Sequence, residues 1–305
     1  MIKKNDLLSI AIPTYKRHEI LYENLCTMIP YLEKYSIAVY ISDDSTDDNT
    51  LKALTPLFER YPLILYSKNE KNLGHDRNCI KTLSLPDTEY IWYLGDSQII
   101  EQKYFSNVLD NLDKYNPDFY VVNAKERCNP IPSKIYSNKE EFFVDLSWHA
   151  TLTGATIYRR TSIDLSEARK FIGSNFIQLG ILLESNSFGI RSLFWDDRPL
   201  IYMNQNKRDS YWTKSVFNVF AKDWCVFVLS LSNYTYDDKL KVIKSHSVHT
   251  GIFAYHQLKA YRKEKVLTLI TYMKYRKYLK YCTSVPLWVM FFVSIMPTVL
   301  IKVEG

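Results

Sequence analysis

The sequence is poor in the residues that build linkers and disulfide scaffolds. Its 305 residues include only 8 Gly and 11 Pro, and its 5 Cys are scattered without a Cys-x-x-Cys pair. This composition excludes a collagen-like chain or a low-complexity linker and favours reduced thiols over a zinc site or disulfide framework. The N-terminal residues have a short apolar run and no small-residue cleavage site, so we expect no secretory signal peptide.

The composition is otherwise that of a soluble globular protein, with one asymmetry of charge. Hydrophobic residues make up 47% and charged residues 24% of the chain, and its length suits one large domain or two smaller ones. Residues 239–305 contain 12 Lys and Arg against 2 acidic residues, a net charge of +10, so the overall charge of +6 leaves −4 for the first 238 residues. A basic tail on a mildly acidic body indicates contact with a membrane surface or a nucleic acid.

The first 125 residues alternate between short apolar runs and stretches with helical spacing of apolar residues. This alternation predicts an open α/β sheet, in which ligands bind at the carboxyl ends of the strands. We expect strands at residues 7–13, 37–42, 63–67, 90–94 and 118–123, and helices at residues 19–32, 50–61, 78–85 and 103–115.

The pattern then becomes less regular and, beyond about residue 210, helical. We expect a helix at 139–146, a strand at 153–159, a helix at 175–183 and extended segments at 192–196 and 198–203. Helices should follow at 215–231 and 237–246, with a long basic stretch at 251–281. We therefore place the end of the sheet domain near residue 210.

Polar clusters follow the predicted strands. Residues 13–17 (Pro-Thr-Tyr-Lys-Arg) suit a nucleotide base and ribose, although an ordinary strand exit has the same composition. Residues 42–50 contain paired Asp residues, one of which could accept the imide N–H of uracil. The alternative is that these Asp, Ser and Thr residues only cap the next helix.

Two further clusters suit phosphate and cation binding. In residues 69–79, Gly74 permits a tight turn, and Arg77 and Asn78 can reach a phosphate or sugar from a helix start; the alternative is a loop before a capped helix. In residues 90–98 a hydrophobic strand releases Asp96 directly after Gly95, where a carboxylate could bind Mg²⁺ or Mn²⁺ with substrate phosphates, or be a solvated turn residue.

The order and spacing of these clusters resemble those of family 2 glycosyltransferases with the GT-A fold. Residues 12–17 match the P-T-Y/F-N/K-R end of the family's first strand, and residues 90–96 match its Y-I-W-x-L-G-D strand. The D-[DN]-x-S-x-D-x-T and N-x-G-x-x-x-N segments are matched by Asp43, Asp44, Thr46, Asp48 and Thr50 and by Asn72, Gly74 and Asn78. The Trp and Gly-Asp version resembles the abequosyltransferase-like branch, which builds bacterial surface polysaccharides.

The resemblance implies a fold class and a set of roles. It implies an α/β protein with a Rossmann-like, mostly parallel sheet flanked by helices and with an α-helical C-terminal extension. Residues 1–210 would form the glycosyltransferase domain, with a nucleotide-sugar-binding half at 1–125 and an acceptor half at 126–210, followed by the helical region 211–305. The nucleotide sugar would be bound by Pro13, Thr14, Tyr15, Arg17, Asp43, Asp44, Asn72, Gly74, Arg77, Asn78, Gly95, Asp96 and Ser97.

The sequence departs from the family at the metal position. The second Asp of the family's metal motif would fall at Gln98, and a neutral amide oxygen is a poorer ligand for Mg²⁺ or Mn²⁺ than a carboxylate. A cation would therefore be weakly held, with Asp96 as its ligand, or replaced by basic side chains. Lys207 and Arg208 could neutralise a diphosphate in its place, or could be a solvated pair.

The resemblance also implies an inverting transfer, in which a base takes the proton of the acceptor hydroxyl. The family's acidic base would fall near Gln178, which cannot accept a proton usefully. The remaining candidates are His149, Glu184 and Asp196 (with Asp197 beside it), each of which also has a structural interpretation. These are a buried histidine, a helix-end charge and a turn with an ion pair.

The C-terminal region combines a basic, Tyr-rich segment with an apolar one. Residues 259–280 contain eight Lys and Arg against one Glu, which predicts a basic helix with an aromatic face, and residues 285–301 carry no charge. Seventeen residues with two prolines are short for a membrane span. An interfacial anchor on an anionic leaflet and a core helix are the two interpretations.

The combined hypothesis is an enzyme that transfers a sugar from a nucleoside diphosphate sugar to a lipid-linked or polysaccharide acceptor. It would act in the cytoplasm, peripherally on the inner face of the membrane. The alternatives are a sugar-nucleotide-binding protein without catalysis and, with no base-reading motif to support it, a nucleic-acid-binding protein that uses the basic tail. The hypothesis requires Pro13, Asp43, Asn78 and Asp96 to converge at one edge of the sheet.

Overall fold

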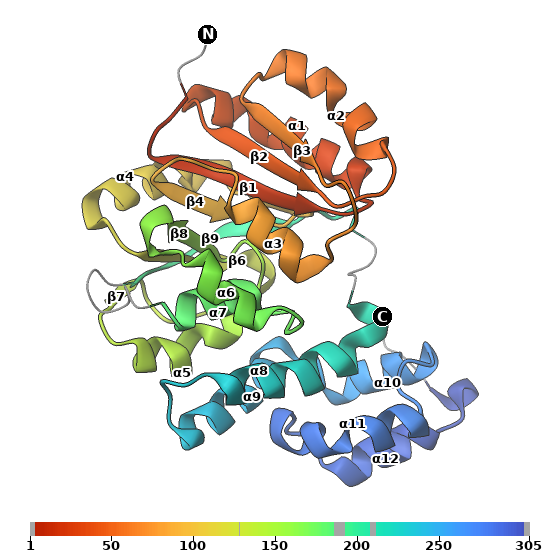
Figure 1. Ribbon diagram of the computed structural model, residues 1–305. Helices are drawn as coiled ribbons and strands as arrows, with labels where there is room; N and C mark the ends of the chain where they lie inside the picture. Colours follow the sequence, from red (N-terminus) through yellow and green to blue (C-terminus); the bar gives the residue numbers. More distant parts are fainter. Residues whose placement is uncertain (1–3, 128, 186–192, 208–211, 302–305) are drawn as a thin grey trace. The chain divides into compact units, whose positions relative to one another are not determined.

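The computed structural model describes residues 4–127, 129–185, 193–207 and 212–301 (Figure 1). The chain forms two compact units, and neither is continuous in sequence. The first unit contains Met1–Phe142, His149–Gly173 and Ile177–Arg208. The second contains Phe143–Trp148, Ser174–Phe176 and Asp209–Gly305. Each unit is described by itself below.

The described residues of the first unit form a nine-stranded sheet. The strand order is β3-β2-β1-β4-β8-β6-β9-β5, and β7 pairs with β9 outside this path. The strands are β1 (Leu8–Thr14), β2 (Ala38–Asp43), β3 (Ile64–Lys68), β4 (Tyr90–Tyr93), β5 (Gln98–Ile100), β6 (Phe119–Ala124), β7 (Lys134–Tyr136), β8 (Thr156–Arg159) and β9 (Leu193–Met203).

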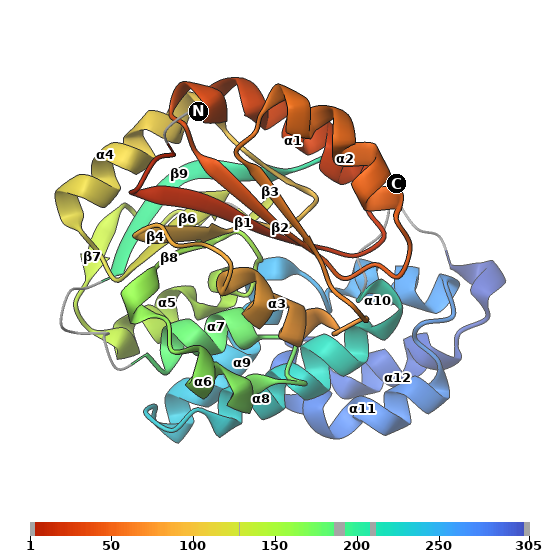
Figure 2. The same ribbon diagram turned by 45° about the horizontal axis from the view of Figure 1, so that its top comes forward.

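The N-terminal half of the sheet is parallel, as predicted. Strand β1 pairs in parallel with β2 and β4, and β2 with β3. The helices of this unit are α1 (His18–Lys34), α2 (Asn49–Arg60), α3 (His75–Leu83), α4 (Phe105–Tyr115), α6 (Leu165–Ala168) and α7 (Ile177–Leu183), and α5 (Lys139–Ala150) has residues in both units. Helices α1, α2 and α4 cover one face, while α3, α6 and α7 lie on the other (Figure 2). Apolar side chains of α1, α2 and α4 share one buried core with the strands.

The other half of the sheet is mixed, so that four of the eight described pairings are parallel. Strand β8 is antiparallel to both β4 and β6, and β9 is antiparallel to β5 and β7. The two extended segments expected at 192–196 and 198–203 form the single strand β9, whose pairing with β6 shifts register around Asn123. A register shift of this kind is how a strand continues through an irregular stretch such as Asp196–Arg198.

The second unit is helical. Its elements are a π-helix (Asn218–Asp223), α8 (Trp224–Ser230), α9 (Tyr236–Thr250), α10 (Tyr255–Lys263), α11 (Leu269–Cys282) and α12 (Leu287–Ile295). The expectation of one basic helix over 259–280 was wrong. The helix is interrupted at Lys265, where φ is 60°. A new helix, α11, follows Thr268, whose hydroxyl caps it by accepting from the N–H of Thr271.

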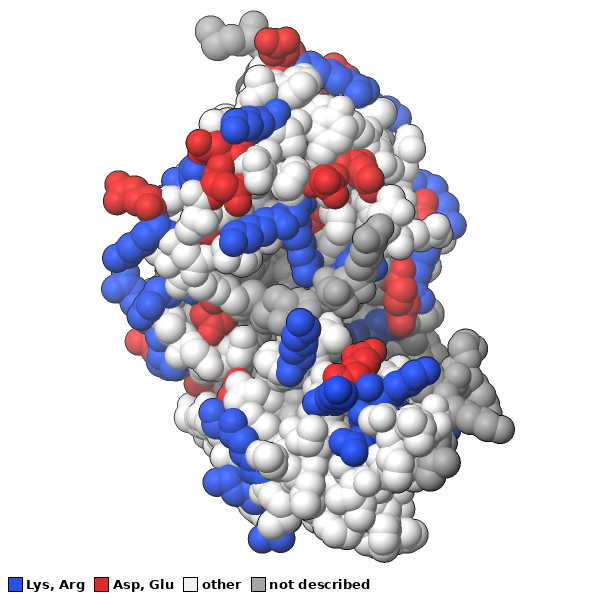
Figure 3. Space-filling model, turned by 90° about the vertical axis from the view of Figure 1, so that its right-hand side faces the viewer, with Lys and Arg blue, Asp and Glu red and all other residues white. Residues whose placement is uncertain are grey.

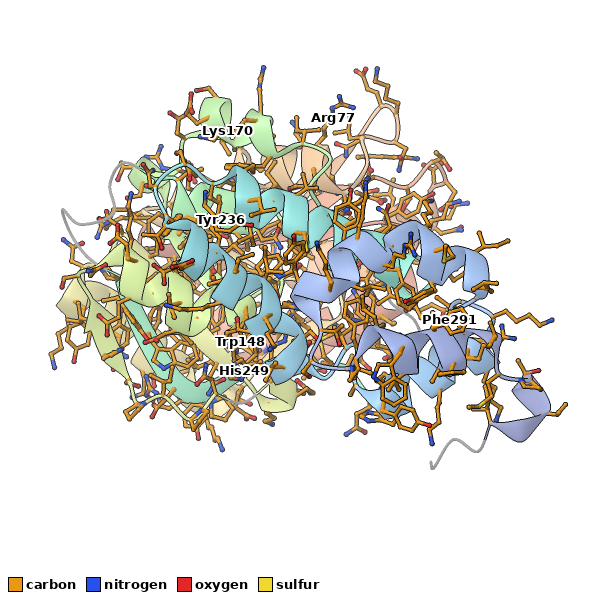
Figure 4. All side chains as sticks on the ribbon, turned by 90° about the horizontal axis from the view of Figure 1, so that it is seen from below. Arg77, Trp148, Lys170, Tyr236, His249 and Phe291 are labelled. Carbon is orange, nitrogen blue, oxygen red and sulfur yellow. The ribbon has the colours of Figure 1, made fainter. Side chains whose placement is uncertain are left out.

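Aromatic side chains build the core of the second unit. Phe176 packs edge-on against Trp224 with ring centroids 5.0 Å apart, and Trp148 stacks on His249 at 4.3 Å (Figure 4). Offset stacks and edge-to-face pairs of this kind add to the stabilisation from buried area alone. The many aromatic residues of the sequence therefore have a structural use here. None of the described helices combines the length and apolarity that crossing a bilayer requires.

Candidate functional site

The polar clusters after β1, β2 and β4 meet at one edge of the sheet. Thr14 and Asp43, the last residues of β1 and β2, are partners in the parallel register. The backbone N–H of Asp44 donates to the carbonyl of Thr14 at 2.9 Å, and the Thr14 hydroxyl donates to Asp96 at 3.2 Å. Asn78 reaches the same edge from α3, since its amide donates to the carbonyl of Ser42 at 3.2 Å. Pro13 pairs with Ser42 in the same register. The structure thus places Pro13, Asp43, Asn78 and Asp96 at one edge of the sheet.

Asp44 fastens a loop. One of its carboxylate oxygens accepts from the amide of Asn69 and the N–H of Leu73, at 2.9 and 2.7 Å. The other accepts from the amide of Asn72 and the N–H of Gly74, both at 2.9 Å. Asp44 is only 3% exposed. Its charge therefore holds residues 69–74 in place, as buried carboxylates with several donors do.

Asp43 lies beside Asp44 with different partners. It accepts from the N–H of Ser45 at 2.9 Å and from the hydroxyl of Tyr66 at 2.8 Å. Burial, together with the adjacent Asp43 carboxylate, raises the pKa of Tyr66, so this hydroxyl remains a donor. Each carboxylate oxygen can accept a further hydrogen bond. Asp43 is therefore oriented at the strand end without being saturated.

The remaining residues of the first and third clusters differ in exposure. Asn78 is buried, and its carbonyl oxygen accepts from Ser42 at 2.7 Å and Asn69 at 2.9 Å, so it ties α3 to β2. The ring of Tyr15 is 47% exposed and lies under the Lys16 ammonium. The side chain of Arg77 is exposed (Figure 4).

Asp96 lies in the turn between β4 and β5, between an alcohol and a cation. Its carboxylate accepts from Thr14 and from Arg17, each at 3.2 Å. Burial raises the pKa of Asp96, and the Arg17 charge opposes this shift. The backbone of the turn is held on both sides: Asn24 of α1 donates to the carbonyl of Asp96 at 2.8 Å, and Asn204 donates through its N–H to the carbonyl of Ser97 at 2.9 Å.

Gln98, at the predicted second metal position, faces the backbone of its own turn. Its side-chain oxygen accepts from the N–H of Gly95 at 2.8 Å, and the residue is 3% exposed. Among the residues that the structure describes, no group of three or more His, Cys, Asp or Glu side chains could hold a metal ion. Because its oxygen is hydrogen-bonded to Gly95, Gln98 as it is held here does not supply the second protein ligand of a cation site at positions 96 and 98.

Two of the candidate bases are committed to structural contacts. His149 is fully buried, its Nε2 lies 3.0 Å from the carbonyl of Val122, and burial, with the charge of Arg127, lowers its pKa to about 3. Asp196 is also fully buried, and it accepts from Tyr120 and forms an ion pair with Arg198 within β9.

The third candidate base, Glu184, lies just after α7 and forms an ion pair with Lys170 at 3.7 Å. Arg208, expected to help neutralise a diphosphate, lies outside the described residues, whereas Lys207 lies within them.

Sequence reasoning missed the residues that hold the site from a distance. Tyr66, which orients Asp43, comes from β3, and Asn24 and Asn204, which hold the Asp96 turn, are joined by a 2.7 Å hydrogen bond across 180 residues of sequence. The local sequence around Asn24 and Asn204 does not indicate a role in the site, because Asn is common in loops and at helix ends of any protein. The partner of each lies on another element.

A protein-family model matches the part of the chain that contains these polar clusters. The model described as glycosyl transferase family 2 matches residues 9–169, more than half of the chain. The chain belongs to glycosyl transferase family 2. This confirms the resemblance that the motifs after β1, β2 and β4 had indicated.

One curated member of similar sequence is the abequosyltransferase RfbV of Salmonella typhimurium. It is 33% identical over 123 residues, which are 39% of this chain and 36% of that protein. The match therefore spans little more than a third of the relative's length.

Solved structures share the fold at low sequence identity. Staphylococcus aureus TarS, residues 1–349, in complex with UDP-GlcNAc has a TM-score of 0.58 at 14% identity, over 88% of this chain and 81% of that one. The mannosyltransferase PcManGT of Pyrobaculum calidifontis, in complex with GDP-Man and Mn²⁺, has a TM-score of 0.55 at 11% identity, over 96% and 87%. The expected α/β fold with a helical C-terminal region is thereby confirmed.

Proposed function

We propose that this family 2 protein transfers a sugar from a nucleoside diphosphate sugar to a lipid-linked or polysaccharide acceptor in the synthesis of a cell-surface glycan. The observation that carries the proposal is the convergence of Thr14, Asp43 and Asp96 at the carboxyl edge of the parallel strands. Open α/β sheets bind their ligands at this edge. The relative RfbV and the neighbours with UDP-GlcNAc and GDP-Man support a nucleotide-sugar donor.

In this proposal the residues at the edge bind different parts of the donor. Asp43 accepts a hydrogen bond from the base, and the exposed ring of Tyr15 stacks on the base or ribose. Asp96, held by Thr14 and Arg17, faces the ribose and diphosphate. The acceptor oxygen then bonds to the anomeric carbon, with inversion, as the bond to the nucleoside diphosphate breaks, and the hydroxyl proton is released to solvent. Since His149 and Asp196 have structural partners, the proposal does not use them as the base.

We further propose that the enzyme works peripherally at an anionic membrane surface on the cytoplasmic side. On α12, Met290 and Val293 are buried, while Trp288 is 66% and Phe292 56% exposed. Residues 259–280 add eight Lys and Arg against Glu264. Figure 3 shows a largely uncharged surface with Lys and Arg side chains, and some acidic ones, beside it. Exposed aromatic side chains beside cationic ones are typical of interfacial anchors.

A donor screen tests the proposed function. The protein is heated with UDP-, GDP-, dTDP- and CDP-sugars, and each is assayed for release of the nucleoside diphosphate. A donor at one hundred times its Kd should stabilise the folded state by about 2.7 kcal/mol. The variant Asp43→Asn should lose this stabilisation, whereas Asp47→Asn, on the same loop, should keep it.

The outcomes distinguish the candidate functions. Stabilisation with turnover supports the transferase. Stabilisation by a nucleotide sugar without turnover would identify a binding protein that lacks catalysis. If none of the four classes binds or reacts, the proposed function is wrong.

A further inference from the structure

The side chain of Gln98 is enclosed by backbone. Besides the hydrogen bond from Gly95, it lies against Gly154, where a Cβ atom would come within 2.2 Å of the Gln98 side-chain oxygen. A Cβ at Gly95 would come within 2.8 Å of the same oxygen. The amide therefore occupies the space that two glycines leave open, and its oxygen is used to close the turn.

Asp96 is the carboxylate that remains, and it already faces positive charge. Arg17 lies 3.2 Å from its carboxylate. Lys207 is half-buried and interacts electrostatically with both Asp96 and Arg17: burial and the Arg17 charge lower the pKa of Lys207, while the Asp96 charge opposes them. A divalent cation at Asp96 would meet the repulsion of both side chains.

Lys207 is fixed to the turn that carries Asp96. Its backbone N–H donates to the carbonyl of Asn204 at 3.1 Å. Asn204 in turn donates to the carbonyl of Ser97 at 2.9 Å and to the side chain of Asn24 at 2.7 Å. The backbone of Lys207 is therefore held beside the Asp96 turn by hydrogen bonds within the first unit.

The local charges leave a positive excess. Arg17 and Lys207 carry two positive charges against the single negative charge of Asp96. Glu126, which also interacts with Lys207, lies on an exposed turn, where its carboxylate accepts from the N–H of Met203 at 3.0 Å. A guanidinium paired with this carboxylate and an ammonium that interacts with it electrostatically suit an anionic ligand, since both groups bind phosphate in proteins.

We propose that Arg17 and Lys207 bind the donor diphosphate directly and take the place of a divalent cation, so that donor binding requires neither Mg²⁺ nor Mn²⁺. The inference rests on the proposed function, because it names the groups that would hold the diphosphate of that donor. It follows from the difference between this chain and its family at position 98. There the Gln98 amide forms a hydrogen bond within the turn, where the family has a carboxylate that binds the cation.

Calorimetry on the unaltered protein gives the first test. UDP, GDP, CDP and dTDP are titrated in the presence of EDTA and again with Mn²⁺ or Mg²⁺ in excess. The diphosphate that binds should have the same Kd in EDTA and in Mn²⁺, within about twofold, which is less than 0.5 kcal/mol. A nucleotide that binds with Mn²⁺ but not with EDTA overturns the inference and leaves the proposed function standing. Binding in neither condition contradicts the proposed function itself.

Variants then test the two cations. Lys207→Met should weaken diphosphate binding by about tenfold or more, because a charge-assisted bond to phosphate is lost. Lys207→Arg should retain most of the affinity, and Lys52→Met, an exposed lysine of α2, should change nothing. The corresponding free nucleoside should bind Lys207→Met as it binds the unaltered protein, since it has no phosphate. Equal loss for nucleoside and diphosphate would mean that Lys207 has a structural role, and the inference would be wrong.

Discussion

At the scale of the residue, the neighbouring Asp43 and Asp44 have different roles in this site. Asp44 is saturated by donors of the loop 69–74, whereas Asp43 keeps acceptor capacity at the strand end. The division follows from partners and not from residue type, because both side chains are buried Asp. The motif alone does not distinguish them.

Asp44→Asn should destabilise the protein by about 1–3 kcal/mol, because an amide nitrogen would replace one acceptor and face two of the four donors. Chemical unfolding without nucleotide measures this loss. Asp47→Asn, in the same acidic run but partly exposed, is the control and should have little effect. Equal stability of the two variants would show that Asp44 does not hold the loop.

His149 should make the stability of the protein sensitive to acid. In the unfolded chain its imidazole takes up a proton near pH 6.5, but in the folded protein the pKa is about 3. Below pH 6.5 protons therefore bind the unfolded chain preferentially, and stability is complete above this pH and falls toward pH 3.

Between pH 7 and pH 5 this residue should account for about 2 kcal/mol of the loss. His149→Gln should reduce the pH dependence of the unfolding free energy by this amount, whatever its effect at pH 7, while His256→Gln, at an exposed position of α10, should not. An unchanged slope in His149→Gln would contradict the burial of a neutral imidazole.

At the scale of the element, the turn between β4 and β5 depends on a distant glycine. Gly154 has φ of +91° and adjoins the Gln98 side chain, whereas Gly173 has φ of +92° and open space around it. Substitution by Ala would therefore strain the backbone at both positions, and at Gly154 the new Cβ would also collide with Gln98.

Gly173→Ala should cost about 1 kcal/mol of stability, and Gly154→Ala about 1–3 kcal/mol more. The double variant Gln98→Ala/Gly154→Ala should be more stable than the sum of the single losses predicts, because the collision is gone. Denaturant unfolding of the unaltered protein, Gln98→Ala, Gly154→Ala and the double variant measures this coupling. Additive losses would mean that Gln98 and Gly154 are not in contact.

Elements with a long periodic pattern could be predicted from sequence, and those fixed by distant partners could not. The parallel strands β1 to β4 and their polar ends were found because apolar runs ended in Asp, Asn or Thr. The strands β5 (Gln98–Ile100) and β7 (Lys134–Tyr136) were missed, since three residues are too short for a period. The enclosure of Gln98 depends on Gly154, and the Asp96 turn on Asn204, so neither follows from local pattern.

At the scale of the whole molecule, charge and exposed apolar surface gather in the C-terminal helices. The 66% exposed Trp288 and 56% exposed Phe292 of α12 are one turn apart, and Lys or Arg residues of α10 and α11 precede them in sequence. Neighbouring apolar side chains that remain exposed together mark surfaces that interact with another apolar surface. A lipid interface would provide one.

The protein should therefore sediment with vesicles of anionic lipid and much less with zwitterionic vesicles. Trp288→Ser/Phe292→Ser should weaken this binding by about tenfold or more, since burial of each ring contributes on the order of 1–2 kcal/mol. Tyr236→Ser removes a 60% exposed ring from α9 (Figure 4) and should have no effect. Sedimentation that is equal for both lipids, or that depends on Tyr236 as much as on Trp288, would count against the membrane proposal.

The interleaved order of the two units has a consequence for synthesis on the ribosome. Phe143, Trp148 and Phe176 belong to the second unit, but their ring partners Tyr234, His249 and Trp224 are translated much later. Until those partners emerge, three large aromatic side chains of the nascent polypeptide have no core to enter. Chaperone demand should be greatest in this interval, and a chain that ends before residue 209 would leave these rings without their partners permanently.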